Sequence, residues 1–154
     1  MITITFSLFL VTNRRKEIHN LPGSNKRLGT MDDYFENEFA VFWISGNILF
    51  FEYKPDVVIN LVAAQRIVSD RIRIQKEKAY PVLCDIRGIA DSDKAARDYL
   101  AQHGSVLAKA VGILVDQSVS ILMISFYLKI SKPQVPTKVF NDQAKALEFL
   151  KAFI

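Results

Sequence analysis

The hydrophobic pattern of the chain begins, from residue 39 onward, with two short runs of aromatic and β-branched residues. These runs, Phe39–Ile44 and Ile48–Tyr53, are separated by Ser45-Gly46-Asn47. Because Gly and Asn accept positive φ angles, this spacing predicts a tight β-hairpin. Pro55-Asp56 then ends the second run, and Val57–Ile59 is a candidate for a short extended piece.

After the hairpin, segments with helical periodicity alternate with short apolar runs. Asn60 is expected to cap a helix that ends near Lys76, with an apolar side and with polar residues largely opposite it, namely Arg66, Asp70, Arg73 and Glu77. The later elements are predicted as strands at Pro81–Cys84, Ala108–Val115 and Thr137–Phe140, and as helices at Asp93–His103, at Ser118–Ile130 and from an Asn141 cap through Phe153. This pattern predicts an α/β fold, in which a mixed sheet with an opening β-hairpin carries four packed helices.

The first thirty residues differ from the rest. The apolar stretch Ile2–Val11 precedes Arg14-Arg15-Lys16, whereas a secretory signal carries its positive charge before its apolar stretch. Ten residues are also too few to cross a bilayer, which takes about 20. We expect residues 1–30 to be a loosely attached extension and residues 31–154 to form a single domain. A short membrane-surface anchor and an extra edge strand are the alternatives for the extension.

Charge and cysteine usage narrow the function classes. The net charge of +4 resides in the first thirty residues, because residues 31–154 hold 15 basic and 15 acidic side chains. A neutral body does not predict nucleic-acid binding. Cys84 is the single cysteine and lies in an apolar run, which suits a reducing, cytoplasmic compartment. His19 and His103 have no cysteine partners at metal spacing, so we expect neither metal nor cofactor.

The segment VLCDIRGIADSDKAARDYL, residues 82–100, leads from an apolar strand through an Arg-Gly turn into a helix. Together with the predicted architecture, it resembles the STAS or SpoIIAA-like fold of bacterial anti-sigma-factor antagonists, and more closely a set of small uncharacterised bacterial proteins with that fold. In that family a strand reading L-D-x-S-G is followed by D-S-S-G at the start of a helix. Cys84-Asp85-Ile86-Arg87-Gly88 matches the first part, with Arg87 in place of Ser, and Asp93 matches the second Asp.

The resemblance implies that the family's phosphorylated residue falls on Ala95, which has no hydroxyl group. We therefore expect the phosphorylation switch to be lost. Ser92 could replace it only by placing a dianion between Asp91 and Asp93, where like charges repel. Ser92 or Asp91 is instead predicted to cap the following helix.

The remaining polar residues of this segment also have structural explanations. A carboxylate at the end of a buried strand, such as Asp85, usually accepts backbone N–H groups or pairs with a nearby Arg, here Arg87. Cys84 is expected to be buried and inert. His103, on the apolar side of its helix, is expected to be a core or helix-end residue and not a general base.

The predicted helix at Ser118–Ile130 carries a second apolar stripe, formed by Ile121, Ile124 and Leu128, almost opposite its first. A helix that covers one face of a sheet needs only one stripe. The second stripe is covered within the monomer, associates with another copy or a partner, or contacts a lipid or small apolar ligand.

We expect a non-enzymatic, cytoplasmic interaction module. Its partner is another protein, or a second copy in a homodimer formed through the Ser118–Ile130 helix. The predicted partner-binding loop comprises Asp85, Arg87, Gly88, Asp91, Ser92, Asp93 and Lys94. The alternative is a carrier of a lipid or small hydrophobic ligand, which predicts an apolar cavity of several hundred Å³, about the size of known ligand pockets. The sequence offers no nucleophile–base pair or Gly-rich phosphate loop, so we do not expect an enzyme.

Overall fold

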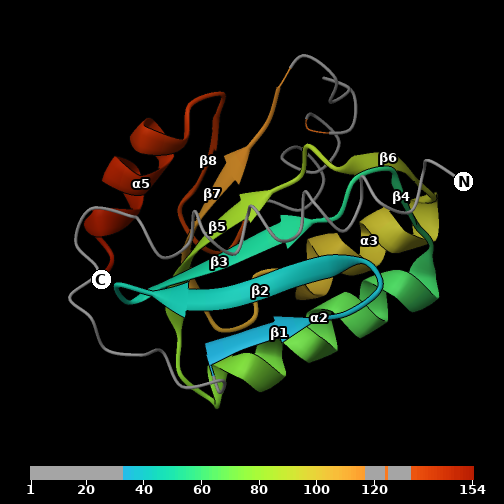
Figure 1. The fold of residues 1–154 in the computed structure, drawn as a ribbon, viewed down its shortest axis with the longest axis horizontal. Helices are drawn as coiled ribbons and strands as arrows, with labels where there is room; N and C mark the ends of the chain where they lie inside the picture. The colour runs from blue at the N-terminus through green and yellow to red at the C-terminus, as the bar shows by residue number, and fades with distance from the viewer. Residues whose placement is uncertain (1–32, 117–123, 125–132) are drawn as a thin grey trace, which may run out of the picture.

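The centre of the molecule is a six-stranded mixed sheet with the strand order β1-β2-β3-β5-β7-β8 (Figure 1). This computed structural model describes residues 33–116, 124 and 133–154. The strands of the sheet are β1 (Tyr34–Glu36), β2 (Ala40–Ser45), β3 (Ile48–Tyr53), β5 (Tyr80–Asp85), β7 (Ala108–Leu114) and β8 (Thr137–Phe140). A separate two-stranded ribbon pairs β4 (Val57–Ile59) with β6 (Ile89–Ser92). The helices within the described residues are α2 (Leu61–Gln75), α3 (Lys94–His103) and α5 (Gln143–Lys151).

The predicted hairpin is confirmed. Strands β2 and β3 are antiparallel, and their register runs from Ala40 opposite Tyr53 to Ser45 opposite Ile48. Gly46 and Asn47 form the turn with φ angles of 57° and 61°, the positive pair that a type I′ turn requires. Strand β1 adds a third antiparallel strand that the sequence analysis missed, because three residues are too few to show an alternation.

Helices cover both faces of the sheet. Strands β3, β5, β7 and β8 run parallel, with α2 and α3 on one face and α5 on the other (Figure 1). Successive side chains of β3 enter two different cores: Leu49 and Phe51 pack on the α2 and α3 side, whereas Phe50 packs on the α5 side with Leu150. Burial on both faces explains why the run was apolar without alternation.

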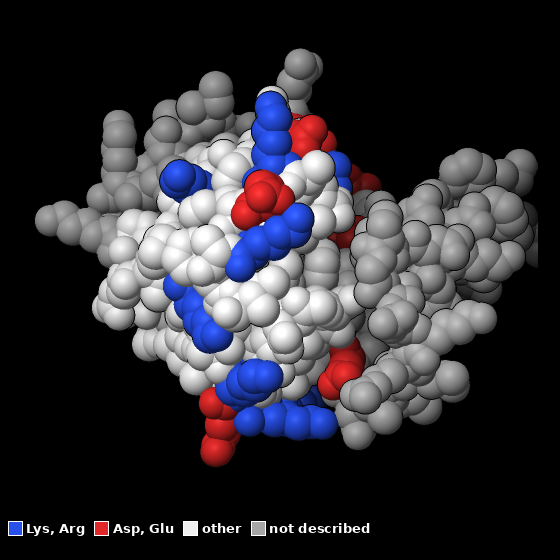
Figure 2. All heavy atoms as spheres, turned by 90° about the vertical axis from the view of Figure 1, so that its left-hand side faces the viewer, with Lys and Arg blue, Asp and Glu red and all other residues white. Residues whose placement is uncertain are grey.

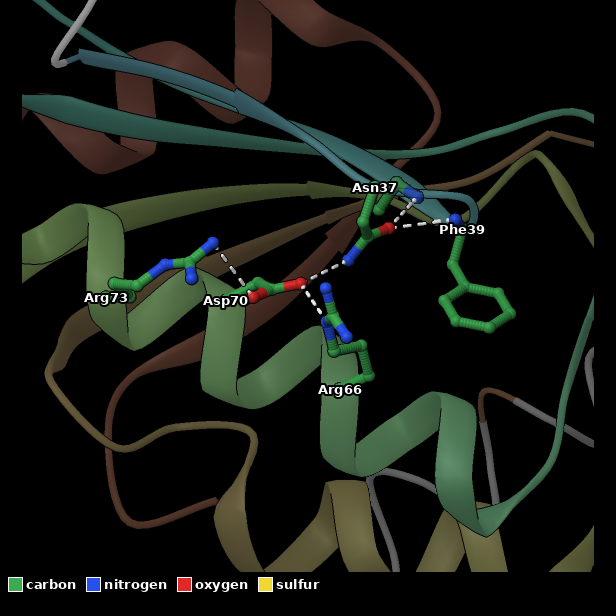
Figure 3. A network of polar contacts seen from close by, with 6 residues as sticks. Asn37, Phe39, Arg66, Asp70 and Arg73 are labelled. Carbon is green, nitrogen blue, oxygen red and sulfur yellow. Dashed lines mark hydrogen bonds and ion pairs between the residues drawn. The ribbon is translucent and has the colours of Figure 1, made fainter.

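One polar residue of α2 departs from the sequence prediction. Asp70 was placed on the solvent side of the helix, but it is only 3 % exposed. Its carboxylate accepts hydrogen bonds from Asn37 Nδ2 at 2.9 Å and from Arg66 Nε at 2.8 Å, and it pairs with Arg73 at 3.2 Å (Figure 3). Asn37 Oδ1 in turn accepts the backbone N–H groups of Phe39 and Ala40. Asp70 therefore fastens α2 to the turn between β1 and β2.

A second buried polar pair fastens the other end of α2. Arg71 Nη1 donates to Gln75 Oε1 at 2.5 Å, and Arg71 Nη2 donates to the Gly104 carbonyl at 3.3 Å. Gln75 Nε2 donates to the carbonyls of Lys78 and Leu107. Buried polar groups need such partners, and here the partners are the backbone turns that lead into β5 and β7.

The capping residues are partly as predicted. Asn60 caps α2 and accepts the Ala63 N–H at 2.9 Å. The prediction of Ser92 or Asp91 as the cap of α3 is wrong, because Asp93 accepts the Ala96 N–H at 2.7 Å. The prediction of Asn141 for α5 is also wrong: Asp142 accepts the Lys145 N–H at 2.9 Å. The Asp93 N–H donates a hydrogen bond to the Ile59 carbonyl. This bond keeps the backbone extended as far as Asp93, so that α3 begins only at Lys94.

The expected α/β architecture with a mixed sheet and an opening hairpin is confirmed, but the count of four helices is not. Three helices lie within the described residues. The fourth predicted helix, residues 118–130, lies outside them except for Ile124, which is helical and half-buried. The predicted extension, residues 1–30, also lies outside the described residues. Strand β6 was missed because four residues after a turn carry no clear period.

Candidate functional site

The predicted site begins where β5 ends, at Asp85. Arg87 donates three hydrogen bonds to this carboxylate: its backbone N–H and its Nε reach Oδ1 at 3.1 and 2.9 Å, and its Nη2 reaches Oδ2 at 2.6 Å. The expected pairing of Asp85 with the following turn and with an Arg is confirmed. The side-chain hydrogen bonding that Arg87 donates to Asp85 is the main cause that raises the pKa of Arg87, and the charges of Glu52 and Asp116 act in the same direction. The guanidinium is thus held in place while the side chain stays 44 % exposed.

Gly88 lets the next turn approach the corner between β3 and β4. A Cβ at this position would lie 2.5 Å from the Tyr53 carbonyl oxygen and also clash with the Lys54 carbonyl oxygen. The Gly88 carbonyl accepts the Val57 N–H at 3.1 Å, which starts the β4–β6 ribbon. Glycine is needed here because two backbone segments approach closely.

A hollow of about 300 Å³ opens at the carboxyl ends of β3 and β5. Its lining comprises Glu52, Tyr53, Pro55, Asp56, Asp85, Arg87, Gly88 and Asp116. Four carboxylates and one guanidinium make this lining negative. Ends of parallel strands are the usual position of binding sites in open α/β sheets. The hollow therefore joins three of the predicted site residues, Asp85, Arg87 and Gly88, with residues that sequence reasoning missed.

Two of the missed residues of the hollow, Glu52 and Asp116, could have been found from their positions in the sequence. Glu52 is a charge near the end of an otherwise apolar strand, and it pairs in register with Asp85. Asp116 follows the apolar strand β7 by two residues. Each is the first acidic residue at the end of a buried strand, as Asp85 is. Although carboxylates gather here, the described residues contain no group of three or more His, Cys, Asp or Glu side chains placed to hold a metal ion.

The other predicted site residues lie outside the hollow. Asp91, Asp93 and Lys94 are exposed along β6 and the start of α3, and Lys94 Nζ pairs with Asp98 at 2.5 Å. Ser92 is buried, and its carbonyl accepts a hydrogen bond from Arg97. The residues of the predicted partner-binding loop are therefore divided between two surfaces. One is the charged hollow, and the other is the exposed segment along β6 and the start of α3.

An apolar cavity of about 80 Å³ lies between the sheet and helices α2 and α3. Phe51, Cys84, Arg71 and Ser92 line it, together with Ile124 of the second apolar stripe. For Ile124, this position agrees with the alternative in which the stripe is covered within the monomer. The other members of that stripe, Ile121 and Leu128, lie outside the described residues. The cavity is smaller than the several hundred Å³ that the carrier hypothesis predicts.

Cys84 is expected to resist alkylation in the folded protein. The Cys84 residue is half-buried, and not fully buried as expected. Loss of solvation of its thiol, assisted by the charge of Asp85 and opposed by that of Arg71, raises the pKa of the thiol to about 12 from 9.0. At pH 8 the thiolate, which is the reactive form, should be about 1000-fold rarer than in an unperturbed cysteine. Because the unfolded thiol ionises first, the free energy of unfolding should also fall as the pH rises from about 9 towards 12.

A thiol-reactive dye measures this directly, since Cys84 is the single cysteine. We expect slow labelling of the folded protein at pH 8. We expect full labelling in about 6 M guanidinium chloride, a concentration above the unfolding midpoint of most proteins. Rapid stoichiometric labelling of the folded protein at pH 8 contradicts the assignment.

His103 lies at the end of α3 and is exposed, so the expectation of a helix-end residue is confirmed and that of a core residue is wrong. Its ring packs on Tyr99 with the centroids 4.4 Å apart. His103 is not part of the lining of the hollow. Among the described residues, the lining of the hollow therefore holds carboxylates and a guanidinium but no imidazole.

The end of the sheet opposite the hollow has a mixed surface. Figure 2 shows Lys and Arg side chains there interspersed with acidic groups and with uncharged surface. Nucleic-acid binders instead gather their basic groups on one face. Among the residues that the structure describes, none of the helices has both the length and the apolar composition needed to cross a membrane.

The arrangement of the strands and helices is an α/β fold of the SpoIIAA-like type, as a comparison with solved structures shows. The chain is similar to the crystal structure of an uncharacterized protein of the DUF3478 family with a SpoIIAA-like fold from Shewanella loihica PV-4, with a TM-score of 0.54 and 14 % identity. The match covers 75 % of this chain and 98 % of that one. The family described as Domain of unknown function (DUF7793) matches residues 42–154, and the chain belongs to this family. A comparison with curated proteins found no match.

Proposed function

We propose that this chain is a non-enzymatic protein-interaction module that binds a partner protein at the carboxyl ends of its parallel strands. The observation that supports this function most is that the Arg87 side chain is both held in place and exposed. Its guanidinium is fixed by Asp85 through two hydrogen bonds, and its backbone N–H donates a third to the same carboxylate. The side chain is nevertheless 44 % exposed at a hollow lined by further carboxylates. A charged group that is ordered before binding loses little entropy on binding.

Two features of the site favour recognition over catalysis. Nucleophilic catalysis with a thiol needs the thiolate, whereas burial raises the pKa of Cys84 to about 12. Cys84 also lines the apolar cavity and is not among the residues of the charged hollow. Among the described residues that line the apolar cavity there is no carboxylate or imidazole that could act as a base for Cys84.

We further propose that binding does not depend on phosphorylation at the family position. Ala95 is exposed at the start of α3, where a hydroxyl would be accessible, but alanine carries none. Ser92 has its hydroxyl in a buried residue close to Arg97. A kinase needs an accessible hydroxyl, so neither position supports the switch.

The experiment is site-specific photo-cross-linking in cells that produce the protein. A photoreactive amino acid replaces Lys94, which lies at the start of α3 outside the hollow but on the strand-to-helix segment that leads from it. As the matched control, it replaces Lys145 on α5 at the other face of the sheet. We expect a discrete adduct with one partner protein from position 94 and none from position 145. In the Arg87→Ala background, which circular dichroism must show to be folded, the adduct from position 94 should fall about tenfold, as for an interface residue worth about 1.4 kcal/mol.

Equal adducts from both positions, or an adduct from position 94 that Arg87→Ala leaves unchanged, would show that this face is not the binding site. No adduct from position 94 in cells where the protein is abundant also contradicts the proposal. Conversion of a small molecule by the purified chain contradicts its non-enzymatic part.

A further inference from the structure

Exposed apolar side chains gather at one place beside the proposed binding site. Among the described residues, the exposed large apolar side chains are Val58 at 62 %, Leu61 at 37 %, Val62 at 71 %, Val106 at 44 % and Ile154 at 54 %. Three of these five, Val58, Leu61 and Val62, fall within one stretch of five residues, here called the Val58–Val62 patch. Single exposed apolar residues are ordinary, whereas several together mark an interaction surface.

The fold does not need apolar residues at these positions. In β4 the side chain of Ile59 is fully buried, and strand alternation directs its neighbour Val58 outward. In α2 the buried residues begin with Ala63 and Ala64, so Leu61 and Val62 lie on the first turn before the packed side. Polar residues would serve both elements equally well. The apolar character of the patch therefore has no role in the core.

Carboxylates border the patch on the ribbon. Val58 pairs in register with Asp91, which is exposed, so the two side chains lie on the same side of the β4–β6 ribbon. Asp56 is exposed two residues before Val58, and Asp93 is exposed where its N–H binds the Ile59 carbonyl. Asp91 thus lies beside the apolar Val58, and two further exposed carboxylates occur near the ends of the same ribbon strands.

The patch is also continuous with the hollow. Asp56 belongs to the lining of the hollow, and the hydrogen bond from Val57 to the Gly88 carbonyl joins the ribbon to its wall. The ribbon is further held at its far end by the bond from Asp93 to Ile59. A partner that reaches the Val58–Val62 patch thus meets the negative lining of the hollow on one side.

We infer that the partner of the proposed function docks on the Val58–Val62 patch with a segment whose apolar side chains are flanked by lysine or arginine. This inference rests on the proposed function and specifies its partner. Burial of apolar side chains supplies the affinity, and charge complementarity with Asp56 and Asp91 supplies the orientation and the rate of association. A segment flanked by acidic residues is repelled from the same surface.

The probe is a library of random 12-residue peptides displayed on phage and selected on the full-length protein at low salt. We expect selected peptides to combine apolar residues with Lys or Arg. For a synthetic copy of the best peptide, the Val58→Ser, Val62→Ser double variant should raise Kd at least about tenfold, as loss of a central apolar contact does. The control Val106→Ser changes an exposed valine elsewhere and should leave Kd unchanged.

The charge part is tested separately. Asp91→Asn should raise Kd about threefold at low salt and should flatten the dependence of Kd on salt concentration. Selection of acidic or uncharged peptides overturns the inference, as does binding that the double variant leaves unchanged. A wild-type protein that sediments as a dimer, and that the double variant makes monomeric, assigns the patch to a second copy and also overturns it.

The outcomes separate this inference from the proposed function. If the adduct at position 94 forms and the Val58→Ser, Val62→Ser double variant leaves it intact, the proposed function holds and the inference fails. If neither an adduct nor selected peptides appear, both fail. If the double variant abolishes the adduct while remaining folded, the partner covers both surfaces.

Discussion

Gly88→Ala is expected to lower the free energy of unfolding by about 3 kcal/mol, the upper part of the range for overpacking. The new Cβ would lie 2.5 Å from the Tyr53 carbonyl oxygen, with the backbone of Lys54 equally close. These neighbours are main-chain atoms, so no flexible side chain can move aside. Either β4 or the turn after β5 must shift, and the hydrogen bond from Val57 to Gly88 is lost. Urea denaturation followed by circular dichroism measures the effect.

Gly112→Ala is the matched control, because it makes the same chemical change in strand β7. There the added Cβ meets Leu150 at 3.5 Å, which is ordinary van der Waals contact. We expect no loss of stability, or a gain of a few tenths of a kcal/mol from reduced freedom of the unfolded chain, up to about 1 kcal/mol. If Gly88→Ala and Gly112→Ala unfold at the same urea concentration, the close approach of the two backbone segments is not as described.

Asp70→Ala is expected to lower the free energy of unfolding by about 2 to 3 kcal/mol, in the range of hydrogen bonds to a charged group. The variant removes the buried carboxylate that accepts from Asn37 and pairs with two arginines (Figure 3). Arg66 and Arg73 are mostly exposed, so water replaces the carboxylate as their partner. The loss of these two ion pairs therefore contributes little to the change in the free energy of unfolding. The main cost is the part-buried Asn37 amide, which orders the turn between β1 and β2 through Phe39 and Ala40.

Asp98→Ala provides the comparison. Asp98 pairs with Lys94 one helical turn away, and such surface pairs contribute only about 0.5 kcal/mol. Hydrogen exchange gives a second measurement, since Asp70→Ala should increase the exchange rates of the Phe39 and Ala40 amides selectively. Equal stability of the two variants would show that the Asp70 network does not hold α2 to the sheet.

The elements with a clear period could be predicted from the sequence. Strands β2 and β3 and the Gly46-Asn47 turn were predicted because positive φ at both positions leaves few alternatives. The cap of α2 was predicted because Asn60 is the only capping side chain directly before the helix. The caps of α3 and α5 were misplaced by one or two residues because several neighbouring Asp, Asn and Ser residues can cap. The choice is made by tertiary hydrogen bonds, such as that from Asp93 to Ile59.

The buried polar residues could not be predicted, for a different reason. Helical periodicity gives the direction of Asp70 but not what lies opposite it, and its partner Asn37 is 33 residues away in the chain. Arg71 and Gln75 have partners in two separate turns. The candidate site was found in part, because Asp85 and Arg87 are neighbours in sequence. Glu52 and Asp116 reach the same hollow only after the strands are arranged in the sheet.

The β4–β6 ribbon links the beginnings of two helices that are far apart in the chain. Asn60 starts α2 directly after β4, and Asp93 starts α3 directly after β6 while its amide is bonded to Ile59. A displacement of either strand therefore moves both capping residues, Asn60 and Asp93. At its other end α2 is fastened through Arg71 and Gln75 to the turns before β5 and β7, so one helix connects the ribbon with the opposite end of the parallel strands.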